Sequence, residues 1–147
     1  MGIESFKILD LFSGAGGFSF GMEKNKHFQT VIAVDFNPNA LATFKYNMPN
    51  TQIINGDITD PKVKDEIIEL SKALEVNMII GGPPCQGFSL KGKKLGLEDP
   101  RNYLFNEYLN IVEKVQPDVF IIENRHRCRA YSPVAFVYSI YMPCFLP

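Results

Sequence analysis

Cys85 lies in a segment that could present a reactive sulfur. Residues 81–89 read Gly-Gly-Pro-Pro-Cys-Gln-Gly-Phe-Ser and follow an apolar run, Val76 to Ile80, that is typical of a buried strand. Two prolines fix φ and remove two N–H donors, so the strand cannot continue, and the flanking glycines allow close backbone approach. A thiolate there could act as a nucleophile at the edge where open α/β sheets bind ligands. Taken alone, a free cysteine is more often a small buried hydrophobe.

Glu123 offers a second chemically useful group. It stands near the end of the apolar stretch Pro117 to Asn124, which predicts another strand. A carboxyl group can exchange a proton with a substrate nitrogen only if it is held within hydrogen-bond reach. By itself Glu123 could equally be an exposed acid at a strand end. Together with Cys85 on a neighbouring strand end, it favours a catalytic pair.

A glycine-rich turn, Ser13-Gly-Ala-Gly-Gly17, follows the predicted first strand from Lys7 to Phe12. It leads into a helix expected from about Phe18 to Lys24. Such a turn lets a ligand lie against bare backbone near a helix N-terminus. The signal is weak alone, because the spacing lacks the third glycine or alanine of the dinucleotide fingerprint.

Two acids follow the next predicted strands. Asp35 ends the strand from Thr30 and falls about 20 residues after the glycine turn, where a carboxylate can accept hydrogen bonds from ribose hydroxyls. Phe36 could stack on an adenine or pack on the core. Asp57 follows the short strand at Ile53 and Ile54, placed to accept the exocyclic amine of adenine with Ile58 against the ring. The alternative for Asp35 is a simple turn cap.

The elements that must position these residues alternate strand and helix. Helices are expected from Pro38 to about Asn47, from Pro61 to about Glu75 with Asp60 as N-cap, and after Asp99 to about Val115. Ligand-type residues at the carboxyl end of each strand indicate a doubly wound α/β fold with an adenosine-cofactor site.

Composition is that of an ordinary globular chain. The 147 residues suffice for one domain, with 46% hydrophobic and 21% charged residues. No signal-type segment or apolar span of membrane length is visible, and three distant cysteines do not form a disulfide framework, so we expect a cytoplasmic protein. Net charge is −1, but four cations follow Cys85 and could hold phosphates unless they simply face solvent, namely Lys91, Lys93, Lys94 and Arg101.

Several motifs together resemble the DNA (cytosine-5)-methyltransferases, bacterial restriction-modification type. They are Asp10-Leu-Phe-Ser-Gly-Ala-Gly-Gly-Phe18, Pro83-Pro-Cys-Gln86, Asp99-Pro-Arg-Asn-Tyr-Leu-Phe-Asn-Glu107 and Glu123-Asn124, spread over about residues 6 to 124. The resemblance implies a Rossmann-like class I methyltransferase fold and S-adenosyl-L-methionine as cofactor. It also implies the residues that contact this cofactor: Phe12, Gly14, Gly16, Gly17, Asp35, Phe36, Asp57, Ile58, Pro83 and Leu104.

The same resemblance implies a reaction. Cys85 would add to C6 of a cytosine flipped out of double-stranded DNA, while Glu123 hydrogen-bonds or protonates N3. Pro84, Gln86 and Asn124 would complete the catalytic pocket. Ser89 would touch phosphate beside the four cations. A Cys85→Ser protein of full family length that still methylates cytosine would contradict this assignment.

Residues 125–147 depart from the family. Arg125 replaces the valine of its Glu-Asn-Val motif, and the tail has no acid, glycine or lysine and no helical or strand period. We therefore expect residues 1–124 to be the N-terminal half of the catalytic domain, truncated after the fifth strand and inactive alone, without a target-recognition domain. The tail would be frame-shifted or disordered. His126, Cys128 and Cys144 lack zinc-site spacing, so no metal is expected.

Two other functions remain open from the residues alone. A nicotinamide-dependent dehydrogenase would share the glycine turn and Asp35, but leaves the Pro-Pro-Cys-Gln and Glu-Asn segments without a purpose. A non-catalytic module could instead bind the cofactor, or a separate chain that supplies the missing C-terminal half. Cofactor preference and co-expression would separate these alternatives.

Overall fold

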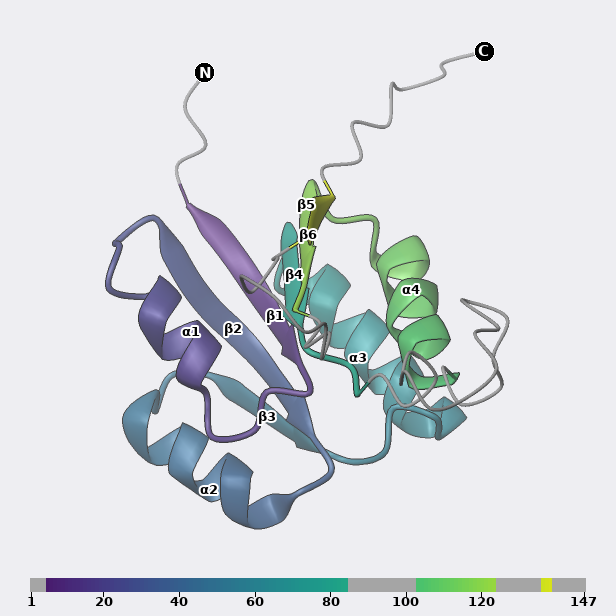
Figure 1. The fold of residues 1–147 in the computed structure, drawn as a ribbon, viewed down its shortest axis with the longest axis horizontal. Helices are drawn as coiled ribbons and strands as arrows, with labels where there is room; N and C mark the ends of the chain where they lie inside the picture. Colours follow the sequence, from purple (N-terminus) through teal and green to yellow (C-terminus); the bar gives the residue numbers. More distant parts are fainter. Residues whose placement is uncertain (1–4, 85–102, 124–135, 139–147) are drawn as a thin grey trace, which may run out of the picture.

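The computed structural model describes residues 5–84, 103–123 and 136–138. Its core is one sheet flanked by helices (Figure 1). The strands are β1 (Phe6–Leu11), β2 (Phe28–Asp35), β3 (Gln52–Asn55), β4 (Met78–Gly81), β5 (Val119–Ile122) and β6 (Phe136–Tyr138). The helices are α1 (Gly17–Met22), α2 (Pro38–Asn47), α3 (Pro61–Ala73) and α4 (Tyr103–Val115).

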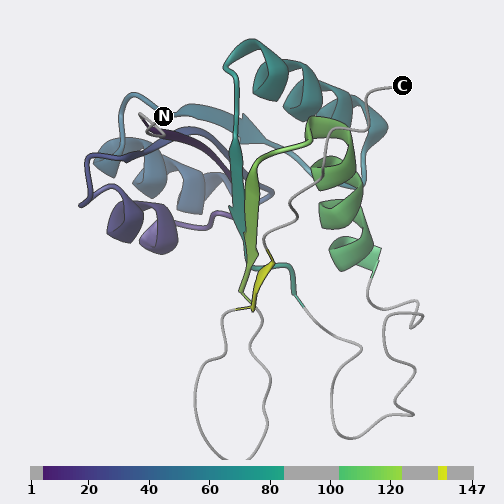
Figure 2. The same ribbon diagram turned by 90° about the horizontal axis from the view of Figure 1, so that it is seen from above.

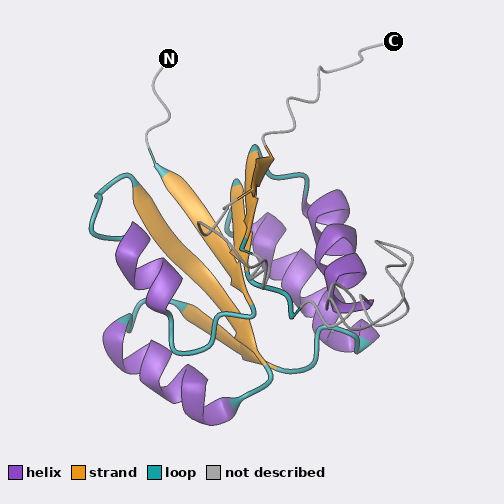
Figure 3. Cartoon of the chain, in the orientation of Figure 1, coloured by secondary structure: helices purple, strands orange, loops and turns teal. Residues whose placement is uncertain are grey.

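The sheet has the order β3-β2-β1-β4-β5-β6, and its first five strands are parallel. Helices α1 and α2 lie on one face and α3 and α4 on the other, as Figures 2 and 3 show from two directions. Strand order reverses between β1 and β4, the place where doubly wound sheets open a crevice for ligands. The predicted doubly wound α/β fold is confirmed.

Two helices begin where the sequence predicts, because a polar cap precedes a proline. The side chain of Asn37 accepts hydrogen bonds from the N–H groups of Asn39 and Ala40, and Pro38 opens α2. Asp60 likewise accepts from the N–H of Lys62, and Pro61 opens α3. Each cap satisfies N–H groups that the first turn of a helix leaves unpaired.

Alternation along the strands divides the apolar side chains between the two faces. Leu9, Leu11 and Ile79 pack with Ile67 of α3 and with Ile111 of α4 in the larger cluster. On the opposite face, the smaller clusters are formed by Ile8, Met78 and Ile80 near α1, and by Ala33, Phe44 and Met48 near α2. Burial on both faces explains why β4 reads as a continuous apolar run and why Ile8, Leu9 and Leu11 of β1 are all apolar.

The region after β5 differs from the sequence-based expectation. We predicted no strand beyond Asn124, but the structure contains β6, which pairs antiparallel with β5 through Ile121 and Val137. A three-residue strand is too short for a period of two to stand out in the sequence. Within the described part of the chain, no helix combines the length and apolar character needed to cross a membrane.

Candidate functional site

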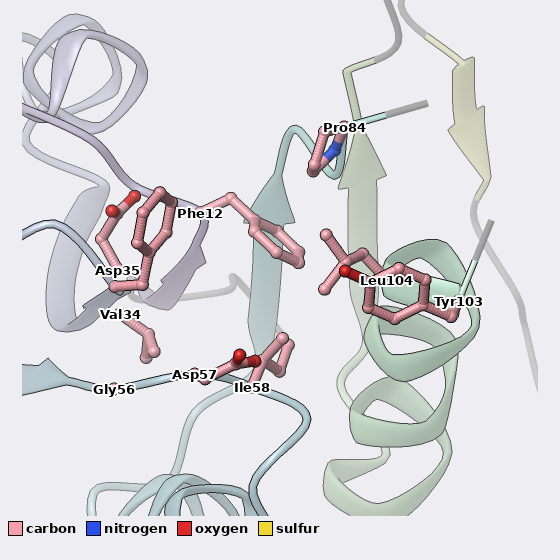
Figure 4. Close-up of a pocket in the computed structure, with 10 residues that line it drawn as sticks. Phe12, Val34, Asp35, Gly56, Asp57, Ile58, Pro84, Tyr103 and Leu104 are labelled. Atoms are coloured by element: carbon pink, nitrogen blue, oxygen red, sulfur yellow. The ribbon is translucent and has the colours of Figure 1, made fainter. Parts of the chain in front are cut away.

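A cavity of about 410 Å³ opens at the carboxyl edge of the sheet. Figure 4 shows that its walls come from the ends of the first four strands and from the start of α4. Its volume falls in the range of small-molecule sites. The lining residues are Phe12, Val34, Asp35, Phe36, Gly56, Asp57, Ile58, Pro84, Tyr103 and Leu104.

Asp35 joins the end of β2 to the glycine turn. One carboxylate oxygen, Oδ2, accepts a hydrogen bond from the N–H of Gly14 at 2.8 Å, and the other, Oδ1, accepts from the N–H of Asn37 at 2.8 Å. A carboxylate has about four lone-pair positions, so both oxygens can still accept from a ligand. Asp35 therefore orders the turn and faces the cavity at the same time.

Asp57 stands on an exposed turn between β3 and α3. Its Oδ1 accepts hydrogen bonds from the backbone N–H of Thr59 at 2.8 Å and from the Thr59 hydroxyl at 2.7 Å. These two bonds, the backbone one first, hold the pKa of Asp57 below its usual 3.8. Because Oδ1 is engaged by Thr59, the other oxygen is available as an acceptor for a ligand that bears a donor.

The glycine turn is shaped partly by packing. Gly16 has φ +91°, and a Cβ there would lie 2.7 Å from side-chain atoms of both Phe44 and Met48, so only glycine lets α2 pack this closely. A Cβ at Gly14 (φ +54°) or at Gly17 would meet nothing within 4 Å. The turn thus has one packed position and two open ones.

A buried carboxyl group lies directly before this turn. Asp10 of β1 is 2% exposed, and Ser19 of α1 donates a hydrogen bond to it at 2.5 Å. Burial is the main cause that raises the pKa of Asp10 from 3.8 to about 7, with the Ser19 bond opposing and the charge of Asp35 adding to the rise. The Asp10–Ser19 hydrogen bond thus links β1, before the glycine turn, to α1, after it.

Phe12, the first residue of the loop, lines the cavity with φ +59°. Positive φ is unusual for a bulky residue and costs about 1–2 kcal/mol. Surrounding structure must hold such a conformation, and strained backbone tends to occur at binding sites. The conformation fits a role for the Phe12 ring as a cavity wall.

Glu123 lies beside the segment that leads to Cys85. Its backbone N–H donates to the carbonyl of Gly81 at 2.9 Å, extending the pairing of β5 with β4. A Cβ on Gly82 would lie 3.3 Å from its carboxylate oxygen Oε2, so the carboxyl group rests over Gly82. Gly82 therefore lets this acid approach the backbone closely, whereas a Cβ on Gly81 would instead meet Leu11 and Tyr108.

The predicted site residues divide into three groups. Those gathered at the cavity are Phe12, Asp35, Phe36, Asp57, Ile58, Pro84 and Leu104, whereas Gly14, Gly16, Gly17, Pro83 and Glu123 are near it but do not line it. Cys85, Gln86, Ser89, Lys91, Lys93, Lys94, Arg101 and Asn124 lie outside the described residues. The sequence reasoning missed Val34, Gly56 and Tyr103; for Tyr103, its place directly before Leu104 was an available signal.

The lining suits an adenosine-type ligand and offers no metal site. Carboxylates at Asp35 and Asp57 are acceptors for hydroxyl and amine donors, and Phe12, Ile58 and Leu104 supply apolar surface for a ring. Within the described ranges, no group of three or more His, Cys, Asp or Glu side chains could hold a metal ion.

Comparisons with known proteins agree on one family. Residues 6–130 match the family described as "C-5 cytosine-specific DNA methylase". The Type II methyltransferase M.AquIA of Picosynechococcus sp. is 44% identical over 120 residues, covering 80% of this chain and 48% of that protein. The Type II methyltransferase M.NgoPII of Neisseria gonorrhoeae is 42% identical over 118 residues, covering 80% of this chain and 33% of that protein.

Solved structures give the same result. A putative DNA modification methyltransferase encoded within an Escherichia coli prophage superposes with a TM-score of 0.62 at 31% identity, covering 82% of this chain and 32% of that one. A DNMT2 mutant from Spodoptera frugiperda has a TM-score of 0.61 at 31% identity, covering 84% of this chain and 36% of that one. The chain thus spans about half the length of M.AquIA and about a third of the other proteins it resembles.

Proposed function

The chain belongs to the C-5 cytosine-specific DNA methylase family, and we propose that it is the cofactor-binding part of an enzyme that methylates C5 of cytosine in DNA. Membership implies a methyl donor. We propose S-adenosyl-L-methionine for that donor, and double-stranded DNA with a flipped-out cytosine for the substrate. A role in a restriction-modification system accords with the Type II methyltransferases that the chain resembles.

The single observation that carries this proposal is the cavity with two strand-end carboxylates. Asp35 follows the glycine turn by the interval at which an acid accepts from ribose hydroxyls. It ends β2, the strand next to β1, and β1 borders the strand-order reversal where such ligands bind. Asp57 would accept the exocyclic amine of adenine. Ile58 and Leu104 would contact the faces of the ring, and Phe36, which is 75% exposed, would be available to stack on it.

The glycine turn would hold the remainder of the methyl donor. Gly14 and Gly17 leave open space where side chains would stand, so a ligand could approach their backbone. Gly16 contributes indirectly, because its packing against α2 fixes the path of the turn. Pro84 lines the cavity directly before Cys85 in the chain, and we propose that Pro83 also contacts the methyl donor.

Methyl transfer would then depend on Cys85 and Glu123. C5 of cytosine is too electron-poor to take a methyl group unaided, so the Cys85 thiolate would first form a bond to C6. Glu123 would hydrogen-bond or protonate N3 and so stabilise the electron density that the addition displaces onto N3 and C5. Bound S-adenosyl-L-methionine would supply the electrophilic methyl group. Loss of the C5 proton to water and cleavage of the C6–sulfur bond would return Cys85 as thiolate.

DNA contact and completion of the enzyme are further proposals. Ser89, Lys91, Lys93, Lys94 and Arg101 would hold phosphates next to the reactive loop, since cations near a substrate groove supply most non-specific DNA affinity. Gln86 and Asn124 would shape the base pocket. Because the chain spans 48% of M.AquIA, we propose that recognition of the DNA sequence and the remainder of the fold come from additional polypeptide, which a separate chain would supply.

Direct binding tests the cofactor assignment. Calorimetric titration with S-adenosylhomocysteine should give saturable binding, and NAD at the same concentration should give none. Asp57→Ala should weaken binding about tenfold, as expected for a lost hydrogen bond to a polar ligand group. Binding of NAD without S-adenosylhomocysteine would instead favour the dehydrogenase.

Covalent trapping tests the reaction. DNA containing 5-fluorocytosine, incubated with the chain, S-adenosyl-L-methionine and a C-terminal portion of a related methyltransferase, should form an adduct on Cys85, detected by peptide mass spectrometry. Cys128→Ser is the matched control and should leave the adduct intact, whereas Cys85→Ser should abolish it. An adduct that survives Cys85→Ser would exclude Cys85 as the nucleophile.

A further inference from the structure

Tyr103 places a hydroxyl group at the cavity wall opposite the strand-end acids. It is the first residue of α4, is 53% exposed and lines the cavity beside Leu104. Figure 4 shows its ring next to Leu104, with the oxygen turned towards Phe12 and the cavity. The side chain therefore combines an apolar ring on the helix with a polar tip towards the space that a ligand would fill.

The hydrogen-bonding capacity of the lining makes this tip distinctive. The side chains of Asp35 and Asp57, when ionised, can only accept hydrogen bonds. Among the side chains that line the cavity, all within the described residues, Tyr103 is the one that can donate. The two carboxylates require only hydrogen-bond donors from a ligand. A purine base also has ring nitrogens that accept hydrogen bonds, and these need a donor from the protein.

The position of Tyr103 favours a contact with the base of a bound nucleoside over a contact with its sugar. Leu104 packs on the core cluster that contains Ile58, and both residues line the cavity, where they offer apolar surface to the face of a planar ring. Asp57 adjoins this surface from one direction and Tyr103 from the other (Figure 4). Asp35 stands apart, tied to the glycine turn through Gly14.

Resting on the proposed function, we propose that Tyr103 Oη donates a hydrogen bond to a ring nitrogen of the purine base of the bound nucleoside. Asp57 accepts the exocyclic amine of the same base. Asp57 disfavours a 6-oxopurine, because that base would bring a carbonyl oxygen against its carboxylate and leave both acceptors without a donor. Tyr103 supplies the donor that a ring nitrogen of the base requires and is therefore a base-contacting residue of the cofactor cavity.

The test is calorimetric binding of S-adenosylhomocysteine to the full chain and to two matched variants. Tyr103→Phe removes only the hydroxyl group and should weaken binding roughly threefold to tenfold. Tyr46→Phe removes the same group from an α2 residue that is 87% exposed and outside the cavity, and it should leave binding unchanged. Urea unfolding of both variants checks that the fold is retained.

Deaza analogues of S-adenosylhomocysteine locate the bond. In one analogue, the ring nitrogen that Tyr103 contacts is replaced by carbon. The wild-type chain should bind this analogue more weakly than it binds S-adenosylhomocysteine. The Tyr103→Phe variant should bind the two ligands equally well. Unchanged binding by Tyr103→Phe, with Tyr103→Ala weakened, would overturn the proposal and make the ring a simple wall. Absence of binding by the wild-type chain would overturn the proposed cofactor, and this inference with it.

Discussion

The turn after β1 and the acids after β2 and β3 lie at the same edge of the sheet but are held in different ways. The turn is anchored in the core, because Gly16 packs against α2 and buried Asp10 bonds to Ser19 of α1. Asp57 stands on an exposed turn, and its carboxylate is bonded locally by Thr59. The turn is thus fixed by packing and a buried hydrogen bond, whereas Asp57 is held by local bonds at the surface, and for Asp57 we propose a role in ligand binding instead.

The largest expected effect comes from Asp10, in the anchored region. Burial raises its pKa to about 7, so the folded chain holds this proton more tightly than the unfolded chain, whose pKa is 3.8. The contribution of Asp10 to stability is therefore greatest below about pH 4 and is lost as pH rises to about 7, by roughly 4 kcal/mol in total. Asp10→Asn keeps an acceptor for Ser19 and cannot ionise, so its stability should change less across this interval.

Urea unfolding between pH 4 and pH 8 measures this effect. Asp118→Asn, which alters an exposed carboxyl group, is the matched control and should retain the wild-type pH dependence. If wild-type and Asp10→Asn proteins lose stability in parallel as pH rises, ionisation of Asp10 is not the cause, and the buried anchor of the turn needs another explanation.

Gly16→Ala should produce the next largest loss. The new methyl group would meet Phe44 and Met48 at 2.7 Å, and φ +91° is unfavourable for any residue with a Cβ. Strain and overpacking together should cost about 3 kcal/mol of unfolding free energy. Gly17→Ala, where a Cβ meets nothing within 4 Å, is the control and should change stability by less than about 0.5 kcal/mol. Equal losses in both variants would contradict the packed role of Gly16.

Much of the fold could be predicted because local signals and global plan agree. The capped starts of α2 and α3 follow from Asn37-Pro38 and Asp60-Pro61, which are short-range patterns with direct physical causes. The doubly wound α/β plan followed from the alternation of apolar runs with helical stretches. Strand β6 could not be predicted, because its pairing with β5 depends on a long-range contact that three residues cannot encode.

The site was less completely predictable for a similar reason. The strand-end acids could be found, since their type and spacing carry the signal. That Gly16 serves α2 packing depends on Phe44 and Met48, about 30 residues away, and nothing in the turn itself indicates them. Tyr103 joins the cavity because α4 returns its first turn to the sheet edge, which is a tertiary relation. The catalytic roles of Cys85 and Glu123 stay predictions.

Asp35 should show an intermediate effect, because it belongs to both regions. Asp35→Ala would leave the N–H groups of Gly14 and Asn37 without their acceptor and should cost about 1–2 kcal/mol of stability. It should also weaken S-adenosylhomocysteine binding, since the ribose would lose its acceptor. Combined unfolding and calorimetric measurements check both losses. A variant that binds normally would remove Asp35 from the ligand and leave it a purely structural residue.

The smallest effect on stability is expected at Asp57. Asp57→Asn keeps an oxygen for the Thr59 N–H and hydroxyl but replaces the other oxygen by an amide N–H₂ group. Stability should change by less than about 0.5 kcal/mol, as for other exposed positions. Binding of S-adenosylhomocysteine should nevertheless fall about tenfold, because a donor would then face the adenine amine.

The pH dependence of binding sharpens the same point. Thr59 holds the pKa of Asp57 below 3.8, so its carboxylate is ionised throughout the neutral and mildly acidic range. The ratio of wild-type to Asp57→Asn affinity should therefore stay constant between pH 6 and pH 8, the upper part of the interval in which Asp10 titrates. Two results would contradict this independence: an affinity ratio that changes between pH 6 and pH 8, or a loss of unfolding free energy in Asp57→Asn as large as that in Gly16→Ala. Either would mean that Asp57 is coupled to Asp10 and the glycine turn, so that the two regions act as one.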